Sequence, residues 1–155
     1  MKRQFFSAMA ILTFAATLGT NAIPAYGIPR MIKEVEYNDI RAQNLGIDSA
    51  LSKRISGKVG KRDRIDAFRL RIRSNKKFIA SLTNSKNQDA DLELILDANK
   101  NGIVDAGDSK ERISINDGDT PERINKFVKA GDYIIRVVKS DAGNSDNYYQ
   151  LSINM

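Results

Sequence analysis

The chain of 155 residues contains no cysteine, no histidine and no tryptophan, and aromatic residues make up only 7% of it. Without cysteine it forms no disulfide, offers no thiolate nucleophile and builds no cysteine-ligated zinc site. Without histidine it excludes Ser-His and Cys-His catalysis and every histidine-ligated metal. Carboxylate or lysine chemistry remains open to an enzyme, and a hydrophobic share of 41% is enough for one domain with one core.

Basic and acidic residues are concentrated in different parts of the sequence. The net charge is +6, a value that by itself suggests nucleic acid or an anionic surface as partner. Residues 53–77, however, hold eleven Lys and Arg against Asp63 and Asp66, a net charge of +9. Residues 84–122 hold four basic and ten acidic residues, a net charge of −6. The average charge therefore describes neither region.

We expect residues 1–27 to be a signal peptide and residues 28–155 to form a single domain. Lys2 and Arg3 precede an uncharged apolar run from Phe5 to Leu18, and small residues follow. This layout is typical of a cleaved signal, and the run is short for a membrane span. Cleavage fits best after Gly27 and also fits after Ala22, while the alternative is an uncleaved anchor. We predict a secreted or periplasmic protein without stable membrane insertion after cleavage.

Short alternating segments predict an all-β fold. In Ile65–Arg73, apolar residues alternate with Arg69, Arg71 and Arg73, as expected for a strand with one face in the core. A short helical turn is expected near Ile40–Leu45. About eight short strands separated by Asn, Asp, Gly and Ser indicate a jelly-roll-like antiparallel β-sandwich. The expected strands are Arg54–Val59, Ile65–Arg73, Phe78–Leu82, Leu92–Leu96, Ile113–Ile115, Arg123–Val128, Tyr133–Val137 and Tyr149–Ile153.

The segment from Asp97 to Asp108 has the spacing of a twelve-residue calcium loop. Oxygen-bearing side chains stand at positions 1, 3, 5, 9 and 12, Gly102 stands at position 6, and Ile103 would offer its backbone carbonyl. Because a strand precedes the loop, it is not a helix-loop-helix EF-hand. The alternative is a polar hairpin loop without an ion. The candidate ligands are Asp97, Asn99, Asn101, Ile103, Asp105 and Asp108.

A second group of acidic residues lies near the start of the expected domain. Glu34 and Glu36 alternate on an extended segment, so both project to one side, which is unfavourable without a cation between them. Asn38 and Asp39 follow, and Asp63 and Asp66 are the acidic residues within the basic stretch. The spacing leaves two readings open: a second cation site, or pairing of Asp63 and Asp66 with the basic residues Lys61, Arg62 and Arg64.

Five blocks follow one another over residues 34–154. They are Glu34-x-Glu36-x-Asn38-Asp39 with Ala42 and Leu45-Gly46; Ile55-Ser56-Gly57 with Asp63-x-x-Asp66-x-Phe68-x-Leu70; Asp89-x-Asp91-Leu92-x-Leu94-x-Leu96-Asp97; Ala130-Gly131-Asp132-Tyr133-x-Ile135-Arg136-Val137; and Tyr149-x-Leu151-x-Ile153. In this order they resemble the bacterial pre-peptidase C-terminal domain, which is related to the collagen-binding domains of clostridial collagenases. The chain departs from that pattern in having no protease domain beside it and Ala67 where many relatives carry an aromatic residue.

The resemblance implies a jelly-roll-like sandwich without catalytic activity. It also implies calcium ligation by an acidic segment and a following Asp-x-x-Asp. On that basis the expected ligands of the N-terminal site are Glu34, Glu36, Asn38, Asp39, Asp63 and Asp66.

We therefore expect an exported, non-catalytic, calcium-binding β-sandwich that acts as a binding or adhesion module. Arg69, Arg71 and Arg73 could bind an anionic polysaccharide or an extracellular protein, or form a solvated face that pairs with the acidic segment 84–122. Nucleic acid is not expected, because the chain is exported and lacks a nucleic-acid motif. The alternatives are a structural or chaperone-like accessory of a secreted protein, and a hydrolase that uses Asp63 and Asp66 as paired carboxylates.

Overall fold

The computed structural model describes residues 31–36, 38–48, 52–118, 120–140 and 142–155. The expected signal peptide and its cleavage sites lie outside the described residues.

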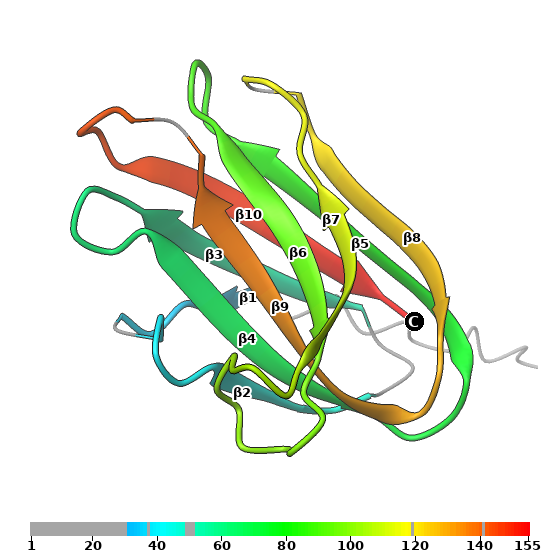
Figure 1. Ribbon diagram of the computed structural model, residues 1–155. Helices are drawn as coiled ribbons and strands as arrows, with labels where there is room; N and C mark the ends of the chain where they lie inside the picture. The colour runs from blue at the N-terminus through cyan, green and yellow to red at the C-terminus, as the bar shows by residue number, and fades with distance from the viewer. Residues whose placement is uncertain (1–30, 37, 49–51, 119, 141) are drawn as a thin grey trace, which may run out of the picture.

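Ten strands form two sheets of five that face each other (Figure 1). The first sheet has the order β1-β3-β10-β5-β8 and the second has the order β2-β4-β9-β6-β7. This all-β sandwich confirms the predicted fold class. The strands are β1 (Met31–Lys33), β2 (Gln43–Ile47), β3 (Lys53–Val59), β4 (Ile65–Ile72), β5 (Lys76–Asn84), β6 (Ala90–Leu96), β7 (Ser109–Ser114), β8 (Glu122–Val128), β9 (Gly131–Lys139) and β10 (Asn147–Asn154).

The eight expected strands are all present, and two short edge strands were not predicted. β1 has three residues and pairs in parallel with β3, and β2 has five residues and pairs in parallel with β4. The other pairs are antiparallel. β1 is too short to display alternation, and β2 is interrupted by Gly46 at φ 83° and by a register shift between Asn44 and Ile47. Neither strand therefore carries a period-2 pattern.

The helical turn expected near Ile40–Leu45 is wrong. The backbone N–H of Ile40 donates to Asp39 Oδ1, that of Ala42 donates to the Gly102 carbonyl, and Gln43 enters β2. These donors are therefore directed away from the i−4 carbonyls that a helix requires. The part of the chain that the structure describes contains no helix, hence none that could cross a bilayer.

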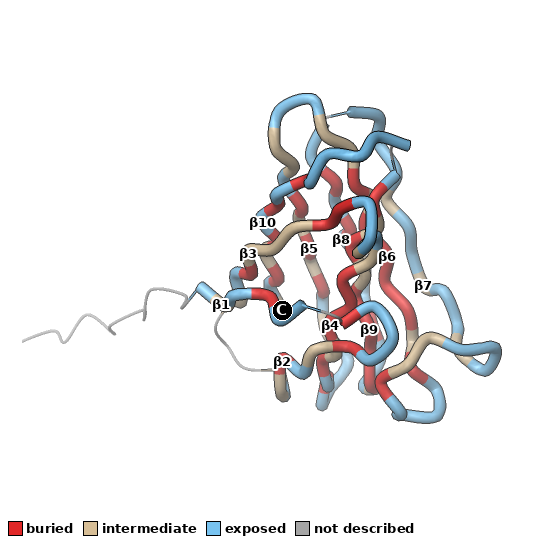
Figure 2. Tube along the Cα trace, turned by 90° about the vertical axis from the view of Figure 1, so that its left-hand side faces the viewer, coloured by how far each residue is buried: buried red, intermediate tan, exposed pale blue. Residues whose placement is uncertain are grey.

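One main core fills the space between the two sheets. Alternate residues of the strands point inward and are buried (Figure 2). In β4, β6 and β9 some outward residues are buried too, and Ala67, Ile95 and Ile134 form a small second cluster there. Phe68, Leu70 and Leu94 from the second sheet meet Phe78 and Leu82 from the first, and each has 0% of its surface exposed. Because the residues of β4 are buried from near the start of the strand, the residues at and just before that start are held rigidly.

We expect Leu94→Ala to destabilise the protein by about 2–5 kcal/mol, since it opens a cavity between the two sheets. Urea unfolding would measure this loss. Ile113→Ala is the control, because Ile113 is 38% exposed on the edge strand β7 and its truncation should change stability by no more than about 0.5 kcal/mol. Equal losses in the two variants would contradict this placement of the core.

Candidate metal centre

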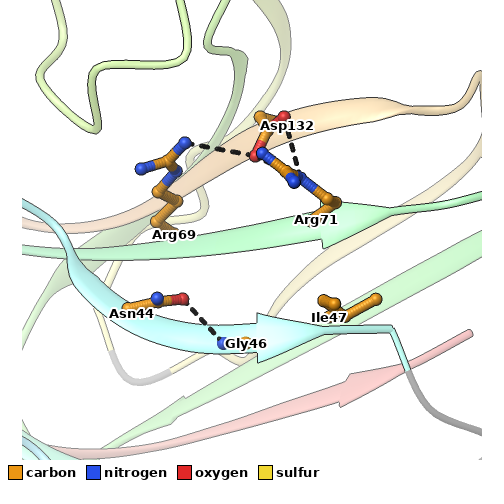
Figure 3. A pocket seen from close by; sticks show the side chains of 6 residues that line it. All are labelled: Asn44, Gly46, Ile47, Arg69, Arg71 and Asp132. Atoms are coloured by element: carbon orange, nitrogen blue, oxygen red, sulfur yellow. Dashed lines mark hydrogen bonds and ion pairs between the residues drawn. The ribbon is translucent and has the colours of Figure 1, made fainter.

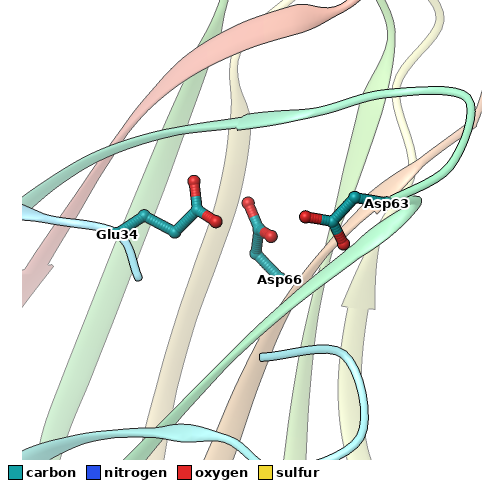
Figure 4. Close-up of side chains that lie close together, drawn as sticks. All are labelled: Glu34, Asp63 and Asp66. Atoms are coloured by element: carbon teal, nitrogen blue, oxygen red, sulfur yellow. The ribbon is translucent and has the colours of Figure 1, made fainter. Parts of the chain in front are cut away.

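Three carboxylates from two distant segments meet at one edge of the sandwich. Glu34, Asp63 and Asp66 each place a carboxylate oxygen within 4.8 Å of the others, and Figure 4 shows Asp66 between its two neighbours. Glu34 follows β1, Asp63 lies in the β3–β4 turn and Asp66 lies within β4. The cluster therefore joins the N-terminal segment to the β3–β4 connection, which links the two sheets.

The backbone holds each of these carboxylates in place. The N–H of Glu34 donates to the Ser56 carbonyl at 3.0 Å, and the N–H of Lys58 donates to Glu34 Oε2 at 3.0 Å. The N–H of Gly60 donates to the Asp63 carbonyl and closes the turn. Asp66 pairs with Val137 in the ladder between β4 and β9. Backbone bonds thus fix the positions from which the three side chains extend, and the Glu34 carboxylate is also held directly.

Several oxygens of the cluster are buried without a hydrogen-bond donor. They are Glu34 Oε1, both carboxylate oxygens of Asp63, and Asp66 Oδ1. Glu34 is 8% exposed and Asp66 is 0% exposed. A buried carboxylate without a partner is costly, because neither water nor a donor compensates its charge. The alternative in which Lys61, Arg62 and Arg64 satisfy Asp63 is not what the structure contains, since neither Asp63 oxygen accepts a hydrogen bond.

The cluster disfavours its own ionisation. Burial, together with the Glu36 and Glu34 carboxylates, raises the pKa of Asp63 to about 7. Burial raises the pKa of Asp66 to about 8, although the Tyr149 hydroxyl opposes that shift. Burial also raises the pKa of Glu34, against the backbone N–H of Lys58. The site therefore holds protons near neutral pH unless a cation replaces them.

The other predicted N-terminal ligands lie around this cluster. Asn38 is 4% exposed, and its Oδ1 accepts the backbone N–H of Ala67 at 3.3 Å beside Asp66. Glu36 is exposed and lies 3.9 Å from Lys58 Nζ. Asp39 is exposed, and its Oδ1 accepts the backbone N–H of Ile40. Asn38 and Glu36 are thus the neighbours placed best to add oxygens to the three carboxylates.

The twelve-residue loop between β6 and β7 has a different arrangement. Asp97 Oδ1 and Oδ2 accept the backbone N–H groups of Asn101 and Gly102, and Asp108 accepts those of Ala98 and Asp105. The side-chain amides of Asn99 and Asn101 donate to Asp105 Oδ2, and they lower the pKa of Asp105. Ile103 donates its N–H to Asn101 Oδ1. The loop oxygens are therefore satisfied by the loop's own donors, and calcium binding there stays a prediction.

The arginine stripe of β4 is engaged with carboxylates of its own sheet. Arg69 Nη2 lies 3.3 Å from Asp132 Oδ1, and Arg71 Nε lies 3.1 Å from the same oxygen (Figure 3). Arg69 Nε also lies 3.7 Å from Asp97, as expected if the stripe pairs with the acidic segment. Arg73 is exposed after β4, and its N–H donates to Asp48. Anion binding by Arg69, Arg71 and Arg73 stays a prediction.

Sequence reasoning missed two residues that shape the carboxylate cluster. Tyr149 donates its hydroxyl to Asp66 Oδ2 at 2.6 Å, although its inward parity in β10 indicated only core packing. Gly57 lies opposite Tyr149 in the ladder between β3 and β10, and a Cβ at that position would overlap the Tyr149 hydroxyl and Glu34 Oε2. A glycine inside a strand was the available signal, because it often marks such a close approach.

Comparison with solved structures bears on the fold. The pre-peptidase C-terminal domain of collagenase from Bacillus anthracis matches with a TM-score of 0.58 and 22% identity, over 74% of this chain and 96% of that one. This chain has the pre-peptidase C-terminal fold. The resemblance inferred from the five blocks is thereby confirmed at the level of the fold. No protein-family model matches the chain, and no curated protein matches it.

Two other solved structures are more remote. A periplasmic inhibitor of g-type lysozyme from Aeromonas hydrophila matches with a TM-score of 0.46 and 13% identity, over 74% of this chain and 96% of that one. The Yersinia pseudotuberculosis-derived mitogen matches with a TM-score of 0.49 and 15% identity, over 69% of this chain and 87% of that one. Both likenesses are too distant to carry an argument about function.

We expect the metal-free protein to lose stability as the pH rises from about 4 to about 8. In that window folded Asp63 and Asp66 keep protons that the unfolded chain has released, so the folded state binds more protons. Urea unfolding in chelator at about pH 5 and about pH 8.5 would measure the change. The double variant Asp63→Asn, Asp66→Asn should show a smaller loss. Greater stability at the higher pH in the unmodified chain would contradict the raised pKa values.

Proposed function

We propose that Glu34, Asp63 and Asp66 bind one calcium ion, with Asn38 and Glu36 as additional oxygen donors. The observation that supports this is the set of buried carboxylate oxygens that lack any donor and lie within 4.8 Å of one another. The donors are all oxygen, and the chain has no histidine or cysteine to favour a softer metal. Ca²⁺ takes six to eight oxygens in flexible geometry, which suits donors that come from two separate segments of the chain.

The bound ion would act as a clamp. Glu34 comes from the segment between β1 and β2, whereas Asp63 belongs to the β3–β4 connection and Asp66 to the start of β4. A ligand that binds only the folded state adds about 2.7 kcal/mol of stability at a hundredfold excess over Kd. In an exported protein without disulfides, calcium would supply the cross-link that a disulfide supplies elsewhere.

We expect Asp66→Asn to weaken calcium binding by about tenfold or more, because it removes one buried carboxylate while keeping the side-chain shape. Isothermal titration calorimetry of the full chain would measure this. Hydrogen exchange should show that calcium protects residues 34–36 in the unmodified chain but much less in the variant. Asp146→Asn is the control. Asp146 is an exposed carboxylate paired with Lys58, so this variant should bind calcium as the unmodified chain does. Equal protection of residues 34–36 in calcium and in chelator would rule out the clamp.

We also propose a second, weaker calcium site in the loop from Asp97 to Asp108. Its support is the spacing of oxygen-bearing residues, together with Gly102 at φ 75° in the sharp turn. Binding would exchange loop-internal hydrogen bonds for metal bonds, so the affinity should be low, at about 10⁻⁵ to 10⁻³ M.

Asp105→Asn should therefore remove one of two calcium-binding events in a titration and leave the tighter event unchanged. Asp105 is exposed, so the substitution should alter stability in chelator only slightly. A titration of the unmodified chain that contains a single event, unaffected by Asp105→Asn, would eliminate the loop site.

For the protein as a whole we propose an exported, non-catalytic binding or adhesion module of the periplasm or extracellular space. The hydrolase alternative is disfavoured because Asp66 is 0% exposed and no substrate could reach it. The structural or chaperone-like accessory remains the second candidate. Glycan and matrix-protein arrays probed in calcium and in chelator test the proposal: saturable binding supports the module, hydrolysis of an array substrate supports the enzyme, and no binding at all favours the accessory.

A further inference from the structure

A groove crosses the outer face of the first sheet next to the candidate metal centre. One depression of about 640 Å³ is lined by Met31, Val35, Ser56 and Tyr148, among others. A second of about 400 Å³ is lined by Ser56, Thr83, Tyr148 and Gln150, among others. Ser56, Gly57 and Tyr148 line both, so the two depressions form one groove with Tyr148 between its halves. The groove spans strands β1, β3, β10 and β5, a distance of roughly 14 Å at the usual strand spacing.

The residues that line the smaller depression are all uncharged, in contrast to the outer face of the second sheet. Tyr148, Gln150 and Ser152 are successive outward residues of β10, and Gln150 and Ser152 pair with Thr83 and Ser81 of β5. On the other side, their partners in β3 are Lys58, Ser56 and Arg54. The outer face of the second sheet instead carries charged residues such as Arg71, Glu93 and Arg136. A ligand with charged groups would find no counter-charge among the residues that line the smaller depression.

The charged residues of the groove lie in the larger depression, which Lys33, Glu34, Glu36 and Lys58 help to line. Lys58 Nζ lies 3.2 Å from Asp146 and 3.9 Å from Glu36. Apolar and aromatic side chains are exposed beside them: Met31 is 47%, Val35 is 63% and Tyr148 is 60% exposed. A flat surface that combines an exposed aromatic ring with hydroxyl and amide side chains offers a stacking face and groups that both donate and accept.

We propose that this groove binds an uncharged, hydroxyl-rich polysaccharide, with Tyr148 as the stacking platform and Gln150, Ser56 and Thr83 as hydrogen-bonding partners. The inference rests on the proposed binding function and gives it a site and a ligand class. A peptide strand fits less well, because β3, β10 and β5 each pair on both sides and offer no free backbone edge in the floor. Hydroxyl groups of a glycan need only side chains, which this floor supplies.

The groove and the metal centre share a wall. Glu34 and Gly57 line the larger depression, and Glu34 is also one of the three clustered carboxylates. Calcium at that cluster would order the segment that carries Val35 and Glu36, and so would set the shape of this wall. We therefore expect chelation to weaken glycan binding but not to abolish it, because Tyr148 and Gln150 belong to a strand inside the sheet.

Affinity electrophoresis of the full chain tests the proposal, with native gels that contain a soluble neutral glucan, mannan, xylan or galactan, or the anionic polymer alginate. We expect at least one neutral polymer to retard the protein in calcium. Tyr148→Ala should weaken that affinity by about tenfold or more, whereas Tyr148→Phe, which keeps the ring, should stay within about threefold. Phe127→Ala is the matched control: Phe127 is 67% exposed on β8 of the same sheet, outside the groove, and its removal should have no effect.

Four results would overturn the proposal. Three concern the gels: no retardation by any neutral polymer, retardation by alginate alone, or unchanged affinity in Tyr148→Ala. The fourth is a dimer in sedimentation that Tyr148→Ala dissociates, since the occupant of the groove would then be a second copy of the chain. Calorimetry with calcium separates this failure from failure of the metal proposal. If the protein binds calcium but no glycan retards it, the proposal for the groove alone is overturned. If retardation depends on Tyr148 but the chain binds no calcium, the proposal for the groove is supported and the proposal for the metal centre is overturned.

Discussion

Uncompensated negative charge, held inside the edge of the sandwich, is the constraint on which the rest of the site depends. Asp66 cannot leave, because it is a rung of the ladder between β4 and β9, and Glu34 is fixed by backbone bonds to β3 on both its N–H and its carboxylate. The repulsion between like charges in such a buried place is relieved in only two ways, by binding protons or by binding a cation. The position of the N-terminal segment is therefore tied to what occupies the cluster.

The strands around the cluster are adapted to that constraint. Gly57 leaves room for the Tyr149 hydroxyl, and that hydroxyl is the hydrogen-bond donor to Asp66. Burial and the nearby carboxylates raise the pKa of Tyr149, so it remains a donor throughout the physiological range. A larger residue at position 57 would push against both Tyr149 and Glu34. One missing side chain thus allows β1, β3 and β10 to approach a charged centre that would otherwise separate them.

Local patterns predicted most of the fold, and long-range geometry determined what they missed. Ile65–Arg73 and Tyr149–Ile153 alternate because one face is buried, and this made them recognisable. β1 and β2 are short parallel edge strands whose existence depends on their partners β3 and β4. The alternation of apolar residues could not predict that Glu34 and Asp66, which are 32 positions apart in the sequence, lie close together. The family resemblance suggested that they do. The contact of Tyr149 with Asp66 was not predicted, because parity shows which face a residue occupies but not which polar atom it meets.

The two outer faces of the sandwich differ in a way that follows from the same arrangement. On the second sheet, Arg69 and Arg71 share Asp132, and Arg136 and Lys110 share Glu93, so the charges largely satisfy one another. On the first sheet, consecutive residues of β10 serve opposite sides: Tyr149 reaches inward to Asp66, while Tyr148 stands outward in the proposed groove. Because adjacent residues of a strand are rigidly coupled, any shift of β10 needed to accommodate a cation on one side also moves the aromatic platform on the other. The proposed metal centre and the proposed ligand groove therefore share one strand as well as one wall.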